Sequence, residues 1–499
     1  MRLQILLGLG LISLAQVAHA VVIVDNQGNG DALTIQEGVD LAIANSETVV
    51  EVTGGVPYTG ALNRSIDAQG VDLTIRSRSG PVAAIDCQNL GPAFVFANTE
   101  QLGSVRENLI IQNATEGVSV LAGPRRGTFR NLTISGCGSG IVGNYDPQEQ
   151  PMVIENCTIT NCGTGIEISK ATVTGTDVSG CLYGMRIYES SNATITGCTF
   201  DGNSVGVQTN PGAPHFVDCS FSFNDGDGFL GGSASFDDCV FAGNSGWGAN
   251  VRNFGTSLLT GCTVVGNTAG GVRSAGHDTS TQMTRCTVMD NGVVGVFADY
   301  GGASVEDSIL WGNCGDQATQ YGGNPSYISV SCSLVPAGGV TGITTFTQAL
   351  FDLDPMICTP VQCANVPDGT GDYRIQSGSP AFPTGNPCGR ELGATQESCG
   401  TSGVEPNLAT RDAYGITVSP NPIARDAFLS FRVPTETTAQ VRVLCVDGRL
   451  AQEPWVGRIG AGSTTVPWSV SSDLPGGVYF IRLAVGGVDV AETKAVVVR

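Results

Sequence analysis

The middle of the chain repeats one pattern of apolar and polar positions about every 22 residues, through ten successive segments. An anchor position, most often cysteine, is followed two residues later by an apolar residue in every repeat. These apolar residues are Ile111, Ile134, Ile159, Val178, Phe200, Phe221, Phe241, Val264, Val288 and Leu310. A second apolar position, usually preceded by glycine, lies nine or ten residues after the anchor. Because short alternating segments are typical of strands and glycine is typical of turns, each repeat predicts two short strands separated by a turn.

The fixed period predicts how these strands assemble. Repeats this short, without helical periodicity, are typical of a solenoid of parallel strands in which each repeat forms one turn. Equivalent residues of successive turns would stack about 4.8 Å apart, so ten turns would make a rod about 50 Å long. Near the N-terminus, Ile35, Val39, Ala42 and Ile43 give a predicted helix one apolar face, which would shield the open end of the sheets.

The position five residues after the anchor changes from cysteine to asparagine along the chain. It is occupied first by Cys137, Cys162 and Cys181 and then by Asn203, Asn224, Asn244, Asn267, Asn291 and Asn313. An amide side chain carries both a donor and an acceptor, so stacked asparagines can bond to one another and to the backbone of the turn. We therefore predict a structural asparagine ladder, without a catalytic role.

The repeat also carries a family resemblance. Segments such as Asn156-Cys157-Thr158-Ile159 and Gly261-Cys262-Thr263-Val264 resemble the right-handed parallel β-helix proteins, whose founding members are pectate lyases. The resemblance covers Val21 to Gly400. It implies an all-β fold: a right-handed parallel β-helix solenoid with a short N-terminal capping helix, followed by a small antiparallel β-sandwich. Residues 307–313, 371–375 and 378–381 are similar to the closing module of large exported bacterial β-helix proteins.

Both ends of the chain carry export signals. Arg2, the apolar run from Ile5 to Leu14 and Ala18-His19-Ala20 predict a signal peptide at 1–20 and a secreted or outer-surface location, with a buried first strand as the alternative. No stretch has the roughly 20 continuous apolar residues of a transmembrane helix. After a β-helix at 21–400 and a linker at 401–415, residues 416–499 predict an antiparallel sandwich. That sandwich resembles the C-terminal sorting domain of type-nine secretion substrates, which implies the secretion machinery as a partner; an accessory sandwich is the alternative.

Charge and cysteine content narrow the classes of protein further. With 45 Asp+Glu against 24 Lys+Arg, the net charge of −21 excludes a nucleic-acid binder. Seventeen cysteines favour an oxidising compartment. The anchor cysteines are expected to pack as small buried groups, whereas the disulfide candidates are Cys358, Cys363, Cys388 and Cys399, with Cys314 and Cys332 also available.

The sequence predicts no metal site or cofactor. The pair Cys358 and Cys363 has no matching second pair, so a zinc site is not supported. Calcium is the one cation that the loops at 25–31 and 224–228 could bind, but they lack the bidentate glutamate of a calcium loop, and turn formation explains them better.

Two classes of function remain. The first is a surface rod that binds glycans or proteins or acts as a structural spacer. The second is a polysaccharide lyase or glycoside hydrolase. A lyase needs a metal-binding carboxylate cluster and a base, and a hydrolase needs two carboxylates about 5–10 Å apart. No family catalytic motif matches, so catalytic residues stay unassigned and the rod is favoured.

A ligand would bind where polar and aromatic residues face outward on adjacent turns. Strand alternation predicts one outward row of Glu167, Arg186 and Gln208, and a second row, which consists of Ser169, Tyr188 and Asn210. The alternatives are that Glu167 and Arg186 only bridge turns, or that the site lies at Asn250, Arg252, Arg273 and Asp299 on the same face.

Overall fold

The computed structural model describes most of the chain. The described residues are 21–121, 126–143, 151–188, 193–210, 212–252, 254–321, 327–342, 344–395, 416–419, 421, 423, 425–433, 437–445, 450–460, 462–471, 474–475, 477–485 and 488–497. The predicted signal peptide at 1–20, the predicted linker at 401–415 and Cys399 therefore lie outside the described residues.

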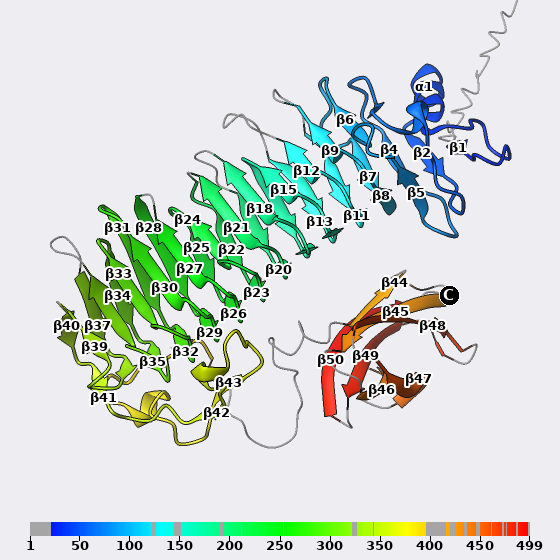
Figure 1. Ribbon diagram of the computed structural model, residues 1–499. Coiled ribbons are helices and arrows are strands. Elements are labelled where there is room, and N and C mark those ends of the chain that lie inside the picture. Colours follow the sequence, from blue (N-terminus) through cyan, green and yellow to red (C-terminus); the bar gives the residue numbers. More distant parts are fainter. Residues whose placement is uncertain are drawn as a thin grey trace, which may run out of the picture.

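Three long parallel sheets form a solenoid in which successive turns stack on one another (Figure 1). The first sheet consists, in order, of β1 (Val22–Val24), β2 (Val49–Val52), β4 (Thr74–Ser77), β7 (Val105–Glu107), β10 (Thr128–Arg130), β13 (Met152–Glu155), β16 (Ala171–Thr174), β19 (Thr194–Thr196), β22 (His215–Val217), β25 (Ser235–Asp237), β28 (Gly255–Thr260), β31 (Thr279–Thr284), β34 (Gly302–Glu306), β37 (Tyr327–Ser331) and β40 (Thr344–Thr347).

The second sheet contains the strand that follows each anchor. Its strands are β5 (Ala83–Asp86), β8 (Leu109–Gln112), β11 (Thr133–Ser135), β14 (Thr158–Thr160), β17 (Asp177–Ser179), β20 (Thr199–Asp201), β23 (Ser220–Ser222), β26 (Val240–Ala242), β29 (Thr263–Val265), β32 (Thr287–Met289), β35 (Ile309–Trp311), β38 (Leu334–Val335) and β41 (Leu350–Phe351).

The third sheet contains the strand that follows the glycine turn. Its strands are β3 (Ile66–Asp67), β6 (Phe94–Phe96), β9 (Glu116–Val120), β12 (Ser139–Gly143), β15 (Thr164–Ile168), β18 (Tyr183–Tyr188), β21 (Val205–Asn210), β24 (Phe229–Gly231), β27 (Trp247–Arg252), β30 (Gly270–Ala275), β33 (Val296–Asp299), β36 (Ala318–Tyr321) and β39 (Val340–Thr341).

Each turn has one strand more than the sequence pattern predicted. The extra strand belongs to the first sheet and lies just before the anchor, as β19 does before Cys198. The prediction of two strands per repeat was wrong because it used only the apolar positions after the anchor. The extra strand has its own buried apolar position three residues before the anchor, as Ile195 lies before Cys198. The predicted parallel stacking of equivalent residues is confirmed, since Phe200, Phe221 and Phe241 are Cα partners on adjacent strands.

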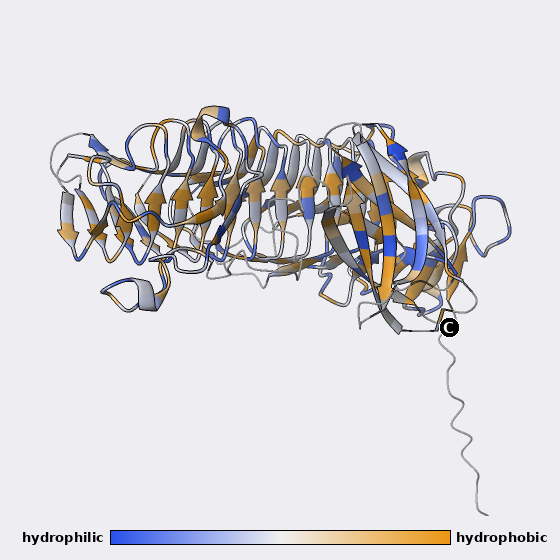
Figure 2. Cartoon of the chain, turned by 90° about the horizontal axis from the view of Figure 1, so that it is seen from below, coloured by the Kyte–Doolittle hydropathy of each residue, from blue (hydrophilic) through white to orange (hydrophobic). Residues whose placement is uncertain are grey.

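The inside of the solenoid is apolar, and hydrophobic and hydrophilic residues alternate along its strands (Figure 2). Phenylalanine side chains stack between turns: the rings of Phe221 and Phe241 are 4.6 Å apart at an interplanar angle of 6°. The anchor cysteines are buried free thiols, as predicted. Their sulfur atoms lie close to backbone carbonyl oxygens, as that of Cys219 does at 3.3 Å from Val217 O.

The asparagine column is buried and hydrogen-bonded from turn to turn. Asn244 Oδ1 accepts from the backbone N–H of Asn224, while Asn244 Nδ2 donates to Phe221 O and to Asn267 Oδ1. The ladder ends at Gln317, whose Oε1 accepts from Asn313. In the earlier turns a thiol accepts instead, because the backbone N–H of Cys162 lies 3.4 Å from the sulfur of Cys181.

A single α-helix among the described residues, α1 (Ile35–Ala44), covers the N-terminal end of the solenoid (Figure 1). Thr34 and Glu37 form a capping box at its first turn. Ile35, Val39 and Ala42 are fully buried, and the partly buried Ile43 packs against the same core, which confirms the predicted capping helix. The described part of the chain has no helix that is both long and apolar enough to cross a membrane.

Residues 352–395 form a closing module on the outer face of the second sheet. It contains the antiparallel pair β42 (Ile357–Thr359) and β43 (Asp372–Ile375) and the 3₁₀ turns η2 (Cys363–Asn365) and η3 (Pro383–Gly385); another 3₁₀ turn, η1 (Ala61–Asn63), lies near α1. Tyr373, Ile375 and Leu392 pack on apolar outward residues of β26 to β38, making a second core outside the solenoid.

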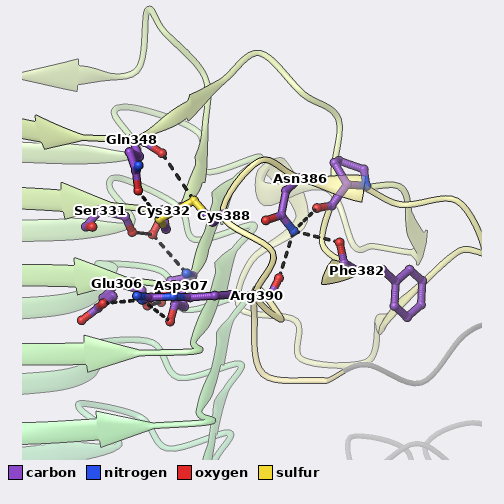
Figure 3. Close-up of a disulfide and its surroundings, with 12 residues drawn as sticks. Glu306, Asp307, Ser331, Cys332, Gln348, Phe382, Asn386, Cys388 and Arg390 are labelled. Carbon is purple, nitrogen blue, oxygen red and sulfur yellow. Dashed lines mark hydrogen bonds and ion pairs between the residues drawn. A yellow bond between two sulfur atoms is a disulfide. The ribbon is translucent and has the colours of Figure 1, made fainter. Parts of the chain in front are cut away.

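Disulfides and ion pairs attach the closing module to the turns. The bridges are Cys314–Cys363 and Cys332–Cys388, and Cys358 is also disulfide-bonded. Figure 3 shows Arg390 extended toward Glu306 and Asp307, with which it forms ion pairs. Four of the predicted disulfide candidates are therefore paired with one another.

The C-terminal segment forms an antiparallel sandwich with its own core. One sheet consists of β44 (Ile416–Ser419), β45 (Asp426–Val433) and β48 (Gly462–Ser469), and the other of β47 (Leu450–Ile459), β46 (Thr437–Cys445), β49 (Gly477–Val485) and β50 (Val488–Val497). Leu429, Phe431, Val441 and Trp468 are buried between the two sheets.

Candidate functional site

The outer face of the third sheet brings most of the predicted ligand-facing residues together. Glu167, Arg186 and Gln208 are Cα partners on β15, β18 and β21. Tyr188 and Asn210 are partners at the ends of β18 and β21. Strand register therefore places them in the two rows that alternation predicted.

Ser169 does not belong to these outward residues. It is only 1% exposed, whereas the prediction placed it beside Tyr188 on the surface. Only Ser169 and Lys170 separate β15 from β16, so the chain turns at once into the first sheet and the small serine side chain is covered at this corner. The prediction for Ser169 was wrong because alternation applies only within the strand.

Glu167, Tyr183, Arg186 and Tyr188 form what we call the arginine–tyrosine cluster. The guanidinium carbon of Arg186 lies 4.5 Å from the ring centre of Tyr183 and 5.3 Å from that of Tyr188. Burial, and then the charge and hydrogen bond of Glu167, raise the pKa of Tyr188. The guanidinium of Arg186 thus lies against both tyrosine rings of its own strand, and Tyr188 hydrogen-bonds to Glu167 of the preceding turn. A direct bridge between Glu167 and Arg186 stays a prediction.

A second group of residues lies on the same face, three turns further along. In the first cluster an arginine covers aromatic rings of its own strand, whereas here the nearest arginine comes from the neighbouring strand. This tryptophan cluster consists of Asp227, Trp247, Asn250, Arg273, Phe297 and Asp299. The rings of Trp247 and Phe297 lie 6.0 Å apart with an interplanar angle of 9°. The guanidinium of Arg273 lies 6.0 Å from the Trp247 ring centre and forms an ion pair with Asp299.

Local sequence explains how the indole reaches its partner two turns away. Trp247 is the Cα partner of Gly270 on β30, the turn between Trp247 and Phe297. A Cβ atom at Gly270 would lie 2.3 Å from the indole carbon Cζ3, so any larger residue would displace the ring. Glycine at this position therefore lets the indole lie across the neighbouring strand.

The polar groups of the tryptophan cluster are fixed by Asp227. Its Oδ1 accepts from the backbone N–H of Trp247 at 2.7 Å, and its Oδ2 accepts from Asn250 Nδ2 at 2.9 Å. Asn250 and Arg273 are Cα partners, yet Asn250 Oδ1 and Arg273 Nε are both buried without a hydrogen-bond partner. One acceptor and one donor thus lie unpaired on adjacent strands.

Sequence reasoning found only part of this cluster. Asn250, Arg273 and Asp299 belong to the alternative site that we predicted, and Arg252 lies at the end of the same strand as Asn250. Asp227, Trp247 and Phe297 were missed. Phe297 follows the apolar core position Val296, so alternation could have found it, whereas the position of Trp247 before the glycine turn gave no such signal.

In the two loops that could bind calcium, Asp25, Asp31 and Asp227 accept hydrogen bonds from the protein itself. Asp25 Oδ1 accepts from the backbone N–H of Gln27, and Asp31 Oδ2 accepts from that of Ile23. Within the part of the chain that the structure describes, His, Cys, Asp and Glu side chains do not gather in threes in a way that would hold a metal ion.

Comparison with known proteins defines the class. The family model described as the right-handed β-helix region matches residues 72–221 and 212–334, which together span more than half of the chain. The protein therefore belongs to the right-handed β-helix family. A search of curated proteins finds no match.

Several solved structures share the fold at low sequence identity. Tailspike protein 3 of bacteriophage CBA120 is 13% identical over 72% of this chain and 63% of the tailspike, with a TM-score of 0.45. The catalytic unit of a GH87 α-1,3-glucanase from Streptomyces thermodiastaticus strain HF3-3 is 12% identical over 67% of this chain and 68% of the glucanase, with a TM-score of 0.42. Pectate lyase Pel9A is 13% identical over 78% of this chain and 95% of the lyase, with a TM-score of 0.30. The chain spans less than two thirds of the tailspike, and at these identities the likeness concerns the fold alone.

Proposed function

We propose that the protein is an exported rod that binds a polysaccharide at the tryptophan cluster on the outer face of its third sheet. The observation that carries this proposal is the parallel pair of Trp247 and Phe297 rings beside Arg273, Asp299 and Asn250. Aromatic rings present rigid apolar area next to polar groups. A sugar ring has matching chemistry, with C–H groups on its faces and hydroxyl groups around its edge.

The unpaired atoms of the cluster fit a hydroxyl group. A hydroxyl both donates and accepts, so one placed between Asn250 Oδ1 and Arg273 Nε would satisfy both once the side chains move apart to admit it. Leaving such groups unpaired costs free energy, about 1–3 kcal/mol each, and binding would recover part of that cost.

The charge of the face favours a neutral polysaccharide. The cluster has one arginine, Arg273, against the two carboxylates of Asp227 and Asp299, so it carries no net positive charge, and the chain as a whole has a net charge of −21. A polymer of uronic acids would be repelled by the protein without a basic surface to compensate. We therefore expect binding of a neutral, hydroxyl-rich chain.

Export is the second part of the proposal. The signal-peptide pattern at 1–20 and the resemblance of 416–499 to type-nine sorting domains support delivery to the outside of the cell. The separate core of the sandwich is consistent with a module that acts independently of the solenoid. The secretion machinery would then be the partner of the C-terminal domain.

A binding screen with the full chain tests the polysaccharide site. We expect Trp247→Ala to weaken binding of a neutral polysaccharide at least about tenfold, the loss expected for a central aromatic contact. Arg76→Ala is the matched surface control, because Arg76 is ion-paired with Glu51 on the first sheet, and it should bind normally. Equal affinity of wild type and Trp247→Ala would refute the assignment, and loss of binding in Arg186→Ala with Tyr188→Ala would move the site to the arginine–tyrosine cluster.

The enzyme alternative uses the same cluster. Asp227 and Asp299 are the two carboxylates beside the ring pair and would be the acid and base of a glycoside hydrolase. Incubation with any polysaccharide that binds separates the two functions, since new reducing ends indicate hydrolysis and unsaturated products indicate a lyase.

A further inference from the structure

The second sheet differs from the other two in its charge. None of its thirteen strands, all of which the structure describes, contains Lys or Arg. From β11 to β20 its outward positions carry only hydroxyl and carboxylate groups. These positions are Thr133, Ser135, Thr158, Thr160, Asp177, Ser179, Thr199 and Asp201.

This polar stretch is the part of the second sheet that the closing module does not use as its floor. The closing module packs on the apolar outward residues Ala242, Val265, Met289, Ile309 and Leu334, which lie on β26 to β38. Thr133, Thr158 and Asp177, by contrast, are exposed. We call β11 to β20 the open face of the second sheet; Figure 1 shows these strands on the N-terminal side of the closing module.

The sandwich has a sheet face of opposite character. Residues 416–499 contain 8 Lys+Arg and 7 Asp+Glu, a net charge of +1, which leaves −22 for the rest of the chain. Alternation on the sheet β47–β46–β49–β50 places Arg442, Arg482, Arg458 and Lys494 on the face away from the sandwich core. The same face holds two carboxylates, Glu453, which accepts from Gln440, and Glu492, the Cα partner of Arg482, so its net charge is +2. Arg442 and Arg482 are Cα partners, so their guanidinium groups project side by side. We call this the arginine face.

We infer that the arginine face of the sandwich docks on the open face of the second sheet of the same chain. Guanidinium groups bind carboxylates through paired hydrogen bonds, and Asp177 and Asp201 lie on adjacent strands with hydroxyl acceptors around them. Thr199 donates to Asp177 Oδ1 at 2.6 Å, which orients that carboxylate outward between two turns. An acidic face of the sandwich would be repelled by the acidic surface of the solenoid. The arginine face is basic and does not suffer this repulsion.

The connection between the two parts permits this contact. The closing module lies on the second sheet and its described residues end at 395, while the sandwich begins at Ile416. Twenty residues reach about 70 Å at most, more than the few turns of about 4.8 Å each that separate β35 from β17. A tether of this length raises the effective concentration of one face near the other to the millimolar range. Docking would leave the outer face of the third sheet free, so it is independent of the proposed polysaccharide site.

Charge reversal in the full chain tests the docking. We expect Arg442→Glu with Arg482→Glu to raise the radius of gyration in small-angle scattering at low salt and to remove amide-exchange protection from residues 158–201. Wild type should show the same change only at high salt, because ionic interactions between exposed groups are screened. Arg425→Glu with Arg432→Glu is the matched control, because it changes the net charge by the same amount on the other sheet of the sandwich. Arg425 lies just before β45 and Arg432 lies within it. This variant should leave the radius of gyration and the exchange protection unchanged.

A second charge reversal, on the open face of the second sheet, tests whether the two faces contact each other. Adding Asp177→Arg and Asp201→Arg to the reversed sandwich should bring the radius of gyration and the exchange protection back to the wild-type values. Unchanged scattering and exchange in the first double variant, with circular dichroism showing a folded chain, would overturn the inference. A compact state that appears only as protein concentration rises would also overturn it, in favour of contact between two copies of the chain.

Discussion

At the scale of single residues, one amide side chain links the backbone of the preceding turn to the amide side chain of the next. Asn244 accepts from Asn224 in the preceding turn and donates to Asn267 in the next, inside a core that water does not reach. A buried backbone group without a partner costs about 1–3 kcal/mol, so the column is kept polar in an otherwise apolar interior. The thiols of the earlier turns do the same with a weaker acceptor.

Replacing Asn244 by Ala should lower the free energy of unfolding by about 1–3 kcal/mol, because it leaves the N–H of Asn224 and the carbonyl of Phe221 unpaired. Chemical denaturation measures the change. Asn210→Ala is the control, since Asn210 is exposed at the end of β21 and should have little effect. An unchanged midpoint for Asn244→Ala would contradict the structural role of the ladder.

A second residue-scale prediction concerns pH. Burial raises the pKa of Asp290 to about 7, and the hydrogen bond from the Tyr373 hydroxyl at 3.0 Å only partly opposes the shift. Because the unfolded pKa is lower, about 3.9, the folded state holds this proton more tightly. The stability that it contributes is fully present below about pH 4 and is lost as the pH rises through about 7.

We therefore expect Asp290→Asn to reduce the fall in melting temperature between pH 5 and pH 8, about the range in which Asp290 loses its proton. Asp372→Asn is the control, because the pKa of Asp372 is shifted in the opposite direction. The hydrogen bond and charge of Arg374 lower this pKa, so the stabilisation by Asp372 is present at neutral pH. Melting curves across this range that are identical for wild type and Asp290→Asn would show that Asp290 does not titrate there.

At the scale of elements, the closing module protects the open C-terminal turns of the solenoid. It covers the outward side of the second sheet with its own apolar residues, and its two described bridges cross 49 and 56 residues of sequence. A cross-link over a loop of this length reduces the conformational freedom of the unfolded chain. Arg390 and Tyr373 add polar contacts to the same turns.

Removing the two bridges with Cys363→Ser and Cys388→Ser should lower the free energy of unfolding by at most about 2–5 kcal/mol per bridge. The closing module should then be cut by protease before the solenoid is. Limited proteolysis followed by mass spectrometry locates the first cuts. Reductant should destabilise wild type more than the double variant, which keeps the bridge of Cys358. First cuts in the solenoid strands would contradict the protective role of the module.

At the scale of the whole molecule, the chain consists of a rod and a sandwich with separate cores and different charge. Deleting 416–499 should therefore leave the β-helix folded, with the far-ultraviolet circular dichroism of a parallel β-sheet protein. In the native cell it should also leave the rod in the periplasm, since the proposed sorting signal is lost. Cell fractionation of full-length and truncated chains measures this, and delivery of the truncated chain to the surface would contradict the sorting role.

The sequence by itself determined the repeating turn, the inward apolar positions, the asparagine column and the capping helix. These features depend on periodicity and on local capping chemistry, which short segments carry on their own. Alternation also placed Glu167, Arg186 and Gln208 in one outward row, because strand geometry alone fixes that relation.

Only the tertiary structure decided what the outward side chains contact. It paired Trp247 with Phe297 across Gly270, enclosed Arg186 between two tyrosines, buried Ser169 at a corner and joined Cys314 to Cys363. Each of these outcomes depends on side-chain length, on the tightness of a corner or on the path of the closing module. Periodicity carries no information about any of the three, because it fixes which face a residue occupies and leaves open which neighbour it reaches.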